Sequence, residues 1–176
     1  MTRHRFPIVC AALIALALPA SASAEMLEIY GNGHGSYLGG DAKELSYFAN
    51  NDAGLGAGFT IGAEVLQIDV FLDANFHLGG SQWNQLGIGF DLDLVPGALF
   101  VAPAGQLVYF FGKQEDDTDG VQGLFPRAGV QVGADFATFL YAGLEGYAGY
   151  VVSLPDPEAG FAYIAGAYLG VAVDIL

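Results

Sequence analysis

The chain is poor in cysteine and in basic residues. Its only cysteine is Cys10, so residues 25–176 contain none with which to form a disulfide. Lys and Arg together number five against 19 Asp and Glu, which gives a formal net charge of −14. Such an acidic surface repels phosphate groups, so nucleic acid and anionic lipid head groups are poor partners.

A long apolar run that could form a membrane-spanning helix is also lacking, although the mean hydropathy of +0.45 is high. An apolar stretch from Pro7 to about Pro19 follows Arg3 and Arg5 and precedes the small residues 20–24. This order predicts a signal peptide over residues 1–24 with an A-x-A cleavage site. A membrane anchor is the alternative, but the stretch is shorter than the roughly 20 residues that span a bilayer. Residues 25–176 then form one domain.

Residues 25–176 instead show an apolar pattern with a period of two, which sends successive side chains of a β-strand to opposite faces. Eight segments alternate in this way, at about 27–37, 54–65, 66–77, 85–94, 98–111, 124–135, 140–152 and 161–175. The fifth is ambiguous, because both of its faces are apolar apart from Gln106. When the large apolar residues set the outward face, every charged residue of the segments falls inward. These ten are Glu28, Glu64, Asp69, Asp73, Asp91, Asp93, Arg127, Asp135, Glu145 and Asp174.

An uncharged outer face predicts a membrane barrel rather than a soluble sandwich. The solvent-facing side of a sandwich would carry many Lys and Glu residues, whereas a charge on the lipid face of a membrane barrel costs roughly 2–4 kcal/mol at the midplane. Long or acidic links at 39–53, 112–123 and 153–160, together with one of intermediate length at 79–84, alternate with short links at 65/66, 95–97 and 136–138. We therefore predict an all-β fold, an eight-stranded antiparallel up-and-down transmembrane β-barrel over residues 25–176.

With its signal peptide, eight alternating strands and a strand that reaches the C-terminus, the chain resembles the small outer-membrane barrels of the OmpA, OmpX and OmpW kind. The resemblance implies a location in the outer membrane of a Gram-negative bacterium, surrounded by outer-membrane lipid and lipopolysaccharide. It also implies assembly by the barrel-insertion machinery. Such proteins usually end in an aromatic residue, and this chain departs from that pattern by ending in Leu176.

The inward acidic residues form the candidate functional cluster. An eight-stranded barrel leaves an interior just wide enough for side chains, so buried carboxylates must be hydrated, hydrogen-bonded or paired. We predict a structural polar plug centred on Arg127, the only cation of the segments, with a narrow cation path as the alternative. The predicted lumen cluster consists of Glu28, Glu64, Asp69, Asp73, Asp91, Asp93, Arg127 and Glu145.

No cofactor, metal or catalytic residue is predicted. His34 and His77 face inward, but no spacing guarantees the three or four ligands of a transition-metal site. The loop 115–120 resembles the start of a calcium loop, yet Pro126 stands where the bidentate Glu is required. An enzyme that attacks lipid esters needs Ser and His near the lipid face, and the outward faces contain neither.

We therefore expect a non-enzymatic outer-membrane barrel with an envelope-structural or surface-interaction role. The first alternative is a small pore for cations or small solutes through the acidic lumen. The second is a soluble secreted barrel similar to lipocalins, with its apolar face turned inward. The sequence predicts neither a ligand nor an oligomeric state.

Overall fold

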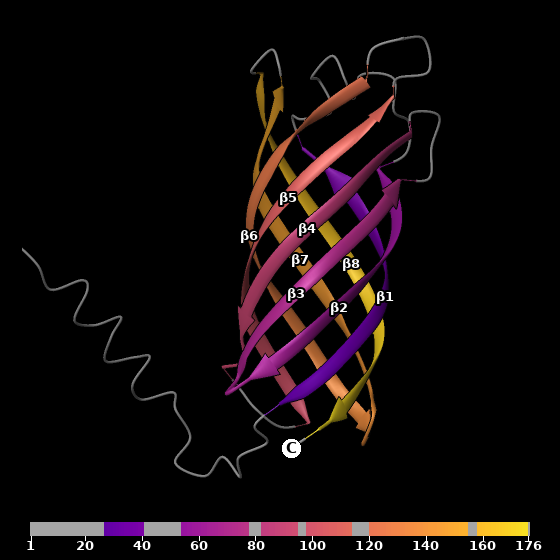
Figure 1. The fold of residues 1–176 in the computed structure, drawn as a ribbon, viewed down its shortest axis with the longest axis vertical. Coiled ribbons are helices and arrows are strands. Elements are labelled where there is room, and N and C mark those ends of the chain that lie inside the picture. Colours follow the sequence, from indigo (N-terminus) through magenta and orange to yellow (C-terminus); the bar gives the residue numbers. More distant parts are fainter. Residues whose placement is uncertain are drawn as a thin grey trace, which may run out of the picture.

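The computed structural model describes residues 27–40, 54–77, 82–94, 98–113, 120–154 and 158–175. The eight strands are β1 (Glu28–Gly39), β2 (Leu55–Val65), β3 (Ile68–His77), β4 (Gln82–Leu92), β5 (Leu99–Lys113), β6 (Gly120–Ala137), β7 (Leu140–Leu154) and β8 (Ala159–Asp174). Each strand pairs antiparallel with the next, and β8 pairs with β1 to close the barrel (Figure 1). Within these ranges no helix is long and apolar enough to cross a membrane. The predicted eight-stranded antiparallel barrel is confirmed.

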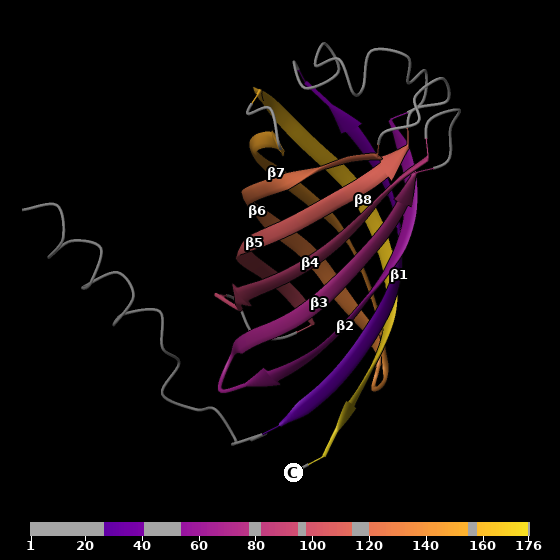
Figure 2. The same cartoon turned by 45° about the horizontal axis from the view of Figure 1, so that its top comes forward.

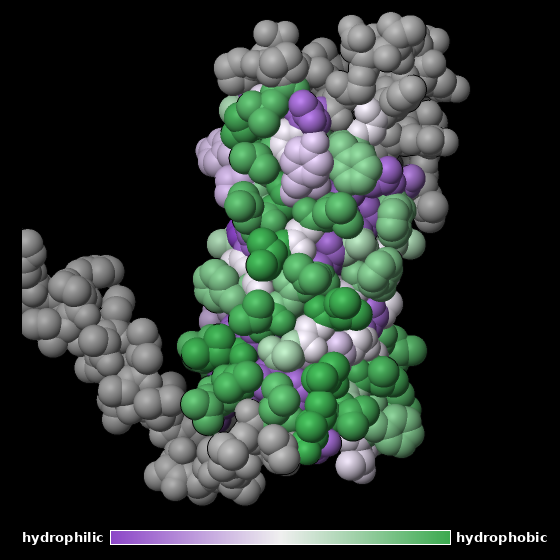
Figure 3. Space-filling view, viewed as in Figure 1, coloured by the Kyte–Doolittle hydropathy of each residue, from purple (hydrophilic) through white to green (hydrophobic). Residues whose placement is uncertain are grey.

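The strands tilt steeply across the wall, as Figures 1 and 2 show, and their side chains alternate as predicted. On β3, the Leu72 side chain faces outward and the residue is 55% exposed, whereas its neighbour Asp73 faces the interior and is 5% exposed. Ala74 is an exception among the outward positions, because it is buried. Its partners on the neighbouring strands are the larger residues Phe59 and Leu86. Figure 3 shows the resulting apolar surface along the barrel.

Aromatic side chains gather on the outer face near the end of the barrel where the longer links lie, which we call the loop end. Those that are exposed there are Tyr37, Phe76, Tyr109, Tyr150, Phe161 and Tyr163. Tyr109 stacks on Phe111 with ring centroids 5.7 Å apart. Aromatic girdles of this kind lie at the membrane interface of outer-membrane barrels. The opposite end, with the short links, is the turn end.

Several predicted strand limits were wrong. Leu66 and Gln67 form a two-residue turn, and β3 begins at Ile68. The alternation could not locate this turn, because an apolar Leu66 continues the outward pattern into Ile68. Residues 82–84, predicted as a link, belong to β4, and the short link near residue 138 is displaced by a bulge between Asp135 and Ala137.

The links at the loop end are also shorter than predicted, because β5, β6, β7 and β8 continue pairing beyond the apolar part of their sequences. Residues 1–24, the loop 115–119 and Leu176 lie outside the described residues, so the signal peptide and the acidic loop remain predictions. The same holds for the side chain of Trp83.

Candidate functional site: the barrel interior

Three successive layers of side chains fill the barrel interior. Near the loop end lies a cluster of apolar side chains, each 3% exposed or less, and the buried polar residues His77, Gln85 and Ser153 lie at the same end on β3, β4 and β7. The cluster comprises Leu38, Val108, Phe110, Phe125, Val151, Ala162 and Ile164, which lie near the loop ends of β1, β5, β6, β7 and β8. We call these seven residues the apolar layer. The sequence did not predict the apolar layer. Both faces of β5 are apolar, so its alternation does not show which side chains face inward.

The middle layer is a polar plug centred on Arg127. Its guanidinium Nη2 lies 3.3 Å from Asp73 Oδ2 and its Nη1 lies 3.4 Å from Gln85 Oε1, while its Nε donates to Gln106 Oε1. The guanidinium also lies over the Tyr147 ring, 4.8 Å from the centroid. Charge-assisted hydrogen bonds and cation–π contacts together hold a buried cation that is only 7% exposed.

Both carboxylate oxygens of Asp73 have partners in the plug. Oδ2 faces Arg127, and Oδ1 accepts a hydrogen bond from Thr60 Oγ1 at 3.0 Å. The His34 Nε2 atom lies 3.7 Å from the same Oδ1. A buried carboxylate is tolerated only with such partners, because its desolvation is costly. The plug is therefore a structural ion pair inside the barrel wall.

Glycine on β2 makes room for this network. A Cβ at Gly58 would overlap both His34 Nε2 and the carbonyl oxygen of Ala74. A Cβ at Gly56 would be 2.5 Å from Asn75 Oδ1, closer than real contacts allow. The inward glycines of β2 thus let side chains of β1 and β3 meet across that strand, which explains part of the abundance of glycine.

Other buried polar groups of the interior hydrogen-bond to one another. Ser36 and His34 are both buried, and Ser36 Oγ accepts a hydrogen bond from Asn75 Nδ2 at 2.7 Å. His77 Nε2 lies 3.0 Å from Gln85 Nε2 rather than near a nucleophile. In the part of the chain that the structure describes, no group of three or more His, Cys, Asp or Glu residues could hold a metal ion.

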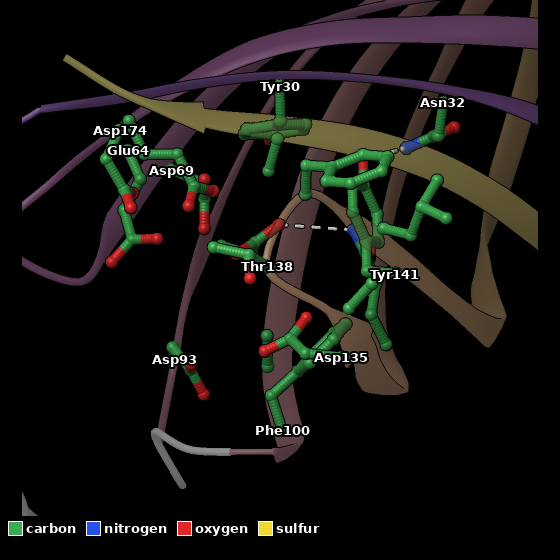
Figure 4. A pocket seen from close by; sticks show the side chains of 18 residues that line it. Tyr30, Asn32, Glu64, Asp69, Asp93, Phe100, Asp135, Thr138, Tyr141 and Asp174 are labelled. Atoms are coloured by element: carbon green, nitrogen blue, oxygen red, sulfur yellow. Dashed lines mark hydrogen bonds between the residues drawn. The ribbon is translucent and has the colours of Figure 1, made fainter.

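The third layer is an acidic cavity at the turn end, which we call the vestibule (Figure 4). It has a volume of about 400 Å³, and none of its lining residues is Lys or Arg. Tyr30, Phe100 and Tyr141 contribute aromatic rings to its wall. Gln131 Nε2 donates to Asp91 Oδ2 at 3.1 Å and to the Tyr147 hydroxyl at 3.0 Å. Its seven carboxylates are Glu28, Glu64, Asp69, Asp91, Asp93, Asp135 and Asp174.

Five of these carboxylates stand directly opposite one another on adjacent strands. The register pairs Asp174 with Glu28, Glu28 with Glu64, Glu64 with Asp69 and Asp69 with Asp91. Like charges in this position destabilise a sheet. The row therefore concentrates negative potential at the turn end.

The predicted lumen cluster thus separates into distinct groups. Arg127 and Asp73 are brought together in the plug, and the two residues are 54 positions apart in the chain. Glu145 lies on β7, opposite Gln131 and Gly166 in the register, and its carboxylate passes over Gly166. The remaining members, Glu28, Glu64, Asp69, Asp91 and Asp93, line the vestibule with Asp135 and Asp174, which the alternation also turned inward.

Comparisons with known proteins agree with this architecture. No protein-family model and no curated protein sequence matches the chain. Among solved structures, it is similar to the N-terminal β-barrel domain of Pseudomonas aeruginosa OprF, with a TM-score of 0.63 and 14% identity over 83% of this chain and 97% of that one. The chain has the fold of the small outer-membrane barrels.

The neisserial surface protein A (NspA) is a second similar structure. It has a TM-score of 0.55 and 7% identity, over 85% of this chain and 97% of its own. Identities this low extend the likeness to the fold alone, because one fold hosts many functions. The neighbours therefore establish the fold and leave the location and the role of the barrel to be inferred from its own interior and surface.

Proposed function

We propose that the protein is a closed, non-enzymatic barrel of the outer membrane with an envelope-structural or surface-interaction role. The observation that carries this proposal is the filled interior. The polar plug fills the interior above the vestibule, and the seven residues of the apolar layer are packed inside the barrel toward the loop end, each 3% exposed or less. Ions cannot cross an apolar layer without losing their hydration, which is costly in a medium without polar partners.

The acidic vestibule favours a second candidate, a pore that passes cations. Its seven carboxylates attract cations toward the turn end, because walls of low dielectric focus the field of like charges. For conduction, however, the Arg127–Asp73 pair and the apolar layer must both move aside. The soluble lipocalin-like alternative is not supported, because every strand carries exposed large apolar side chains on its outer face.

Planar-bilayer recordings at neutral pH test the choice between the first two candidates. The closed barrel predicts no sustained current from protein whose folding in the same preparation is verified by heat-modifiable gel migration. Sustained cation-selective current that falls in Asp69→Asn and Asp91→Asn variants would overturn it in favour of the pore. Fractionation of cells that express the chain tests the location separately, with recovery in the outer membrane as the expected result.

A further inference from the structure

Apolar side chains continue on the outer surface to the very end of the barrel where the turns lie. The residues involved come from β2, the β2–β3 turn, β5, β6, the β6–β7 turn and β8, and each is between 47% and 70% exposed. We call them the turn-end collar: Val65, Leu66, Leu99, Phe136, Phe139 and Val173. In Figure 3 apolar side chains cover the lower part of the barrel around this end. Exposed apolar surface of this extent marks an interface.

Leu66 is the most unusual member of the collar. It occupies the first position of the two-residue turn with φ of 54°, and Gln67 follows with φ of 69°. Turns with two left-handed residues favour Asn, Asp or Gly, because larger side chains are strained there. Leu66 is nonetheless 70% exposed. In water, leucine here would carry two costs, a strained backbone conformation and an exposed apolar side chain. Asn would relieve both. A contact outside the protein therefore favours leucine at this position.

The collar is continuous with the lipid-facing belt. Val65 pairs with Ile68 across the turn, and Ile61 and Val70 extend the same outer face toward the middle of the barrel. Among the described residues that face outward at this end, none is charged. The carboxylates of the vestibule lie behind them on the inner face, and Phe139 lies at the rim, where it is 56% exposed and also lines the vestibule. The charged carboxylates and the apolar collar therefore lie at the same end of the barrel, on the inner and the outer face of its wall.

We propose, on the basis of the outer-membrane location proposed above, that the turn end lies within the lipid of the adjoining leaflet, with Leu66 as a terminal lipid contact and Phe139 as the contact at the rim of the vestibule. Lipid fits the collar better than a protein partner does. The collar is distributed around the barrel on strands far apart in the closed sheet, whereas a protein partner would need a single patch. It also prolongs a surface that already faces lipid. The mouth of the vestibule then opens at the depth of the lipid head groups, whether or not the lumen conducts.

Single-cysteine fluorescence quenching tests this depth directly. Cys10 is the only cysteine, so a Cys10→Ser background has none. Leu66→Cys and Phe139→Cys are labelled with bimane in folded protein in vesicles of phosphatidylethanolamine and phosphatidylglycerol. Leu72→Cys serves as the control in the belt, and Glu158→Cys, at an exposed position of the loop end, serves as the control in water. The quenchers are iodide in water and lipids that carry doxyl groups on their acyl chains.

We expect doxyl lipids to quench the probes at positions 66 and 139 as they quench the one at 72, while iodide quenches only the probe at 158. Quenching by iodide at 66 and 139 to the extent seen at 158 places the turns in water and overturns the proposal. Protection from both quenchers means that protein covers the collar, as a second copy of the chain would, and also overturns it. If Leu66→Cys does not fold, Ile68→Cys, which lies next to the turn, replaces it.

Discussion

Replacement of Arg127 by methionine tests the plug most sharply. Methionine keeps much of the aliphatic volume but leaves Asp73 buried without its cation, 3.3 Å from where the guanidinium nitrogen lay. Removing one partner of a buried ion pair costs about 3–5 kcal/mol, because the remaining charge is uncompensated. Gln85 and Gln106 also lose a donor in this variant. We therefore expect Arg127→Met to lower the free energy of unfolding by about this amount.

A double-mutant cycle separates the ion pair from packing. Asp73→Asn alone leaves Arg127 buried without its anion and is also destabilising, whereas the double variant lacks both charges. We expect a coupling free energy of about 1–3 kcal/mol, measured by urea unfolding in lipid vesicles with gel mobility and circular dichroism as readouts. Glu158→Gln, on the exposed loop end, should change stability by less than about 0.5 kcal/mol. Strictly additive effects of the two plug substitutions would refute the assignment of an ion pair.

Three further substitutions test other parts of the structure by the same unfolding assay. Leu72→Lys places a charge on the lipid face and should cost roughly 2–4 kcal/mol; an unchanged stability would contradict the orientation of β3. Gly58→Ala should cost about 1–3 kcal/mol, since its Cβ would overlap His34 and the Ala74 carbonyl, and a neutral effect would show that the interior has more room. Glu64→Gln removes one charge from the carboxylate row and should stabilise by about 0.2–1 kcal/mol; that gain should shrink in high salt, and a loss of stability would contradict the repulsion.

The orientation of the strands could be predicted from the sequence, because a lipid surface allows few exceptions. Asp69, Asp73 and Leu72 show this on β3, where the period of two assigned each side chain to the correct face. The number of strands and their closure followed from the same pattern and from the alternation of long and short links. Strand limits were less predictable, since Leu66 continued the apolar alternation through a turn.

The layers of the interior could not be predicted from the sequence. They depend on the register between strands, which sets which inward side chains lie at the same height in the closed barrel. The sequence placed Arg127 inward with nine carboxylates and did not identify Asp73 as its partner. That pairing needs the registers of the four strands from β3 to β6. The apolar layer was hidden for a different reason, since inward apolar residues such as Val108 and Phe110 resemble outward ones when both faces of a strand are apolar.

Methyl NMR of the folded protein in lipid nanodiscs tests the central claim, a sealed interior inside an apolar wall, without any substitution. Val70 and Leu72 face outward, whereas Val108 and Val151 lie in the apolar layer. We expect nuclear Overhauser effects from lipid acyl chains to the methyl groups of Val70 and Leu72, and none from lipid or water to those of Val108 and Val151. Water contacts at Val108 and Val151 would reveal an open lumen, and lipid contacts there would reverse the two faces of the wall.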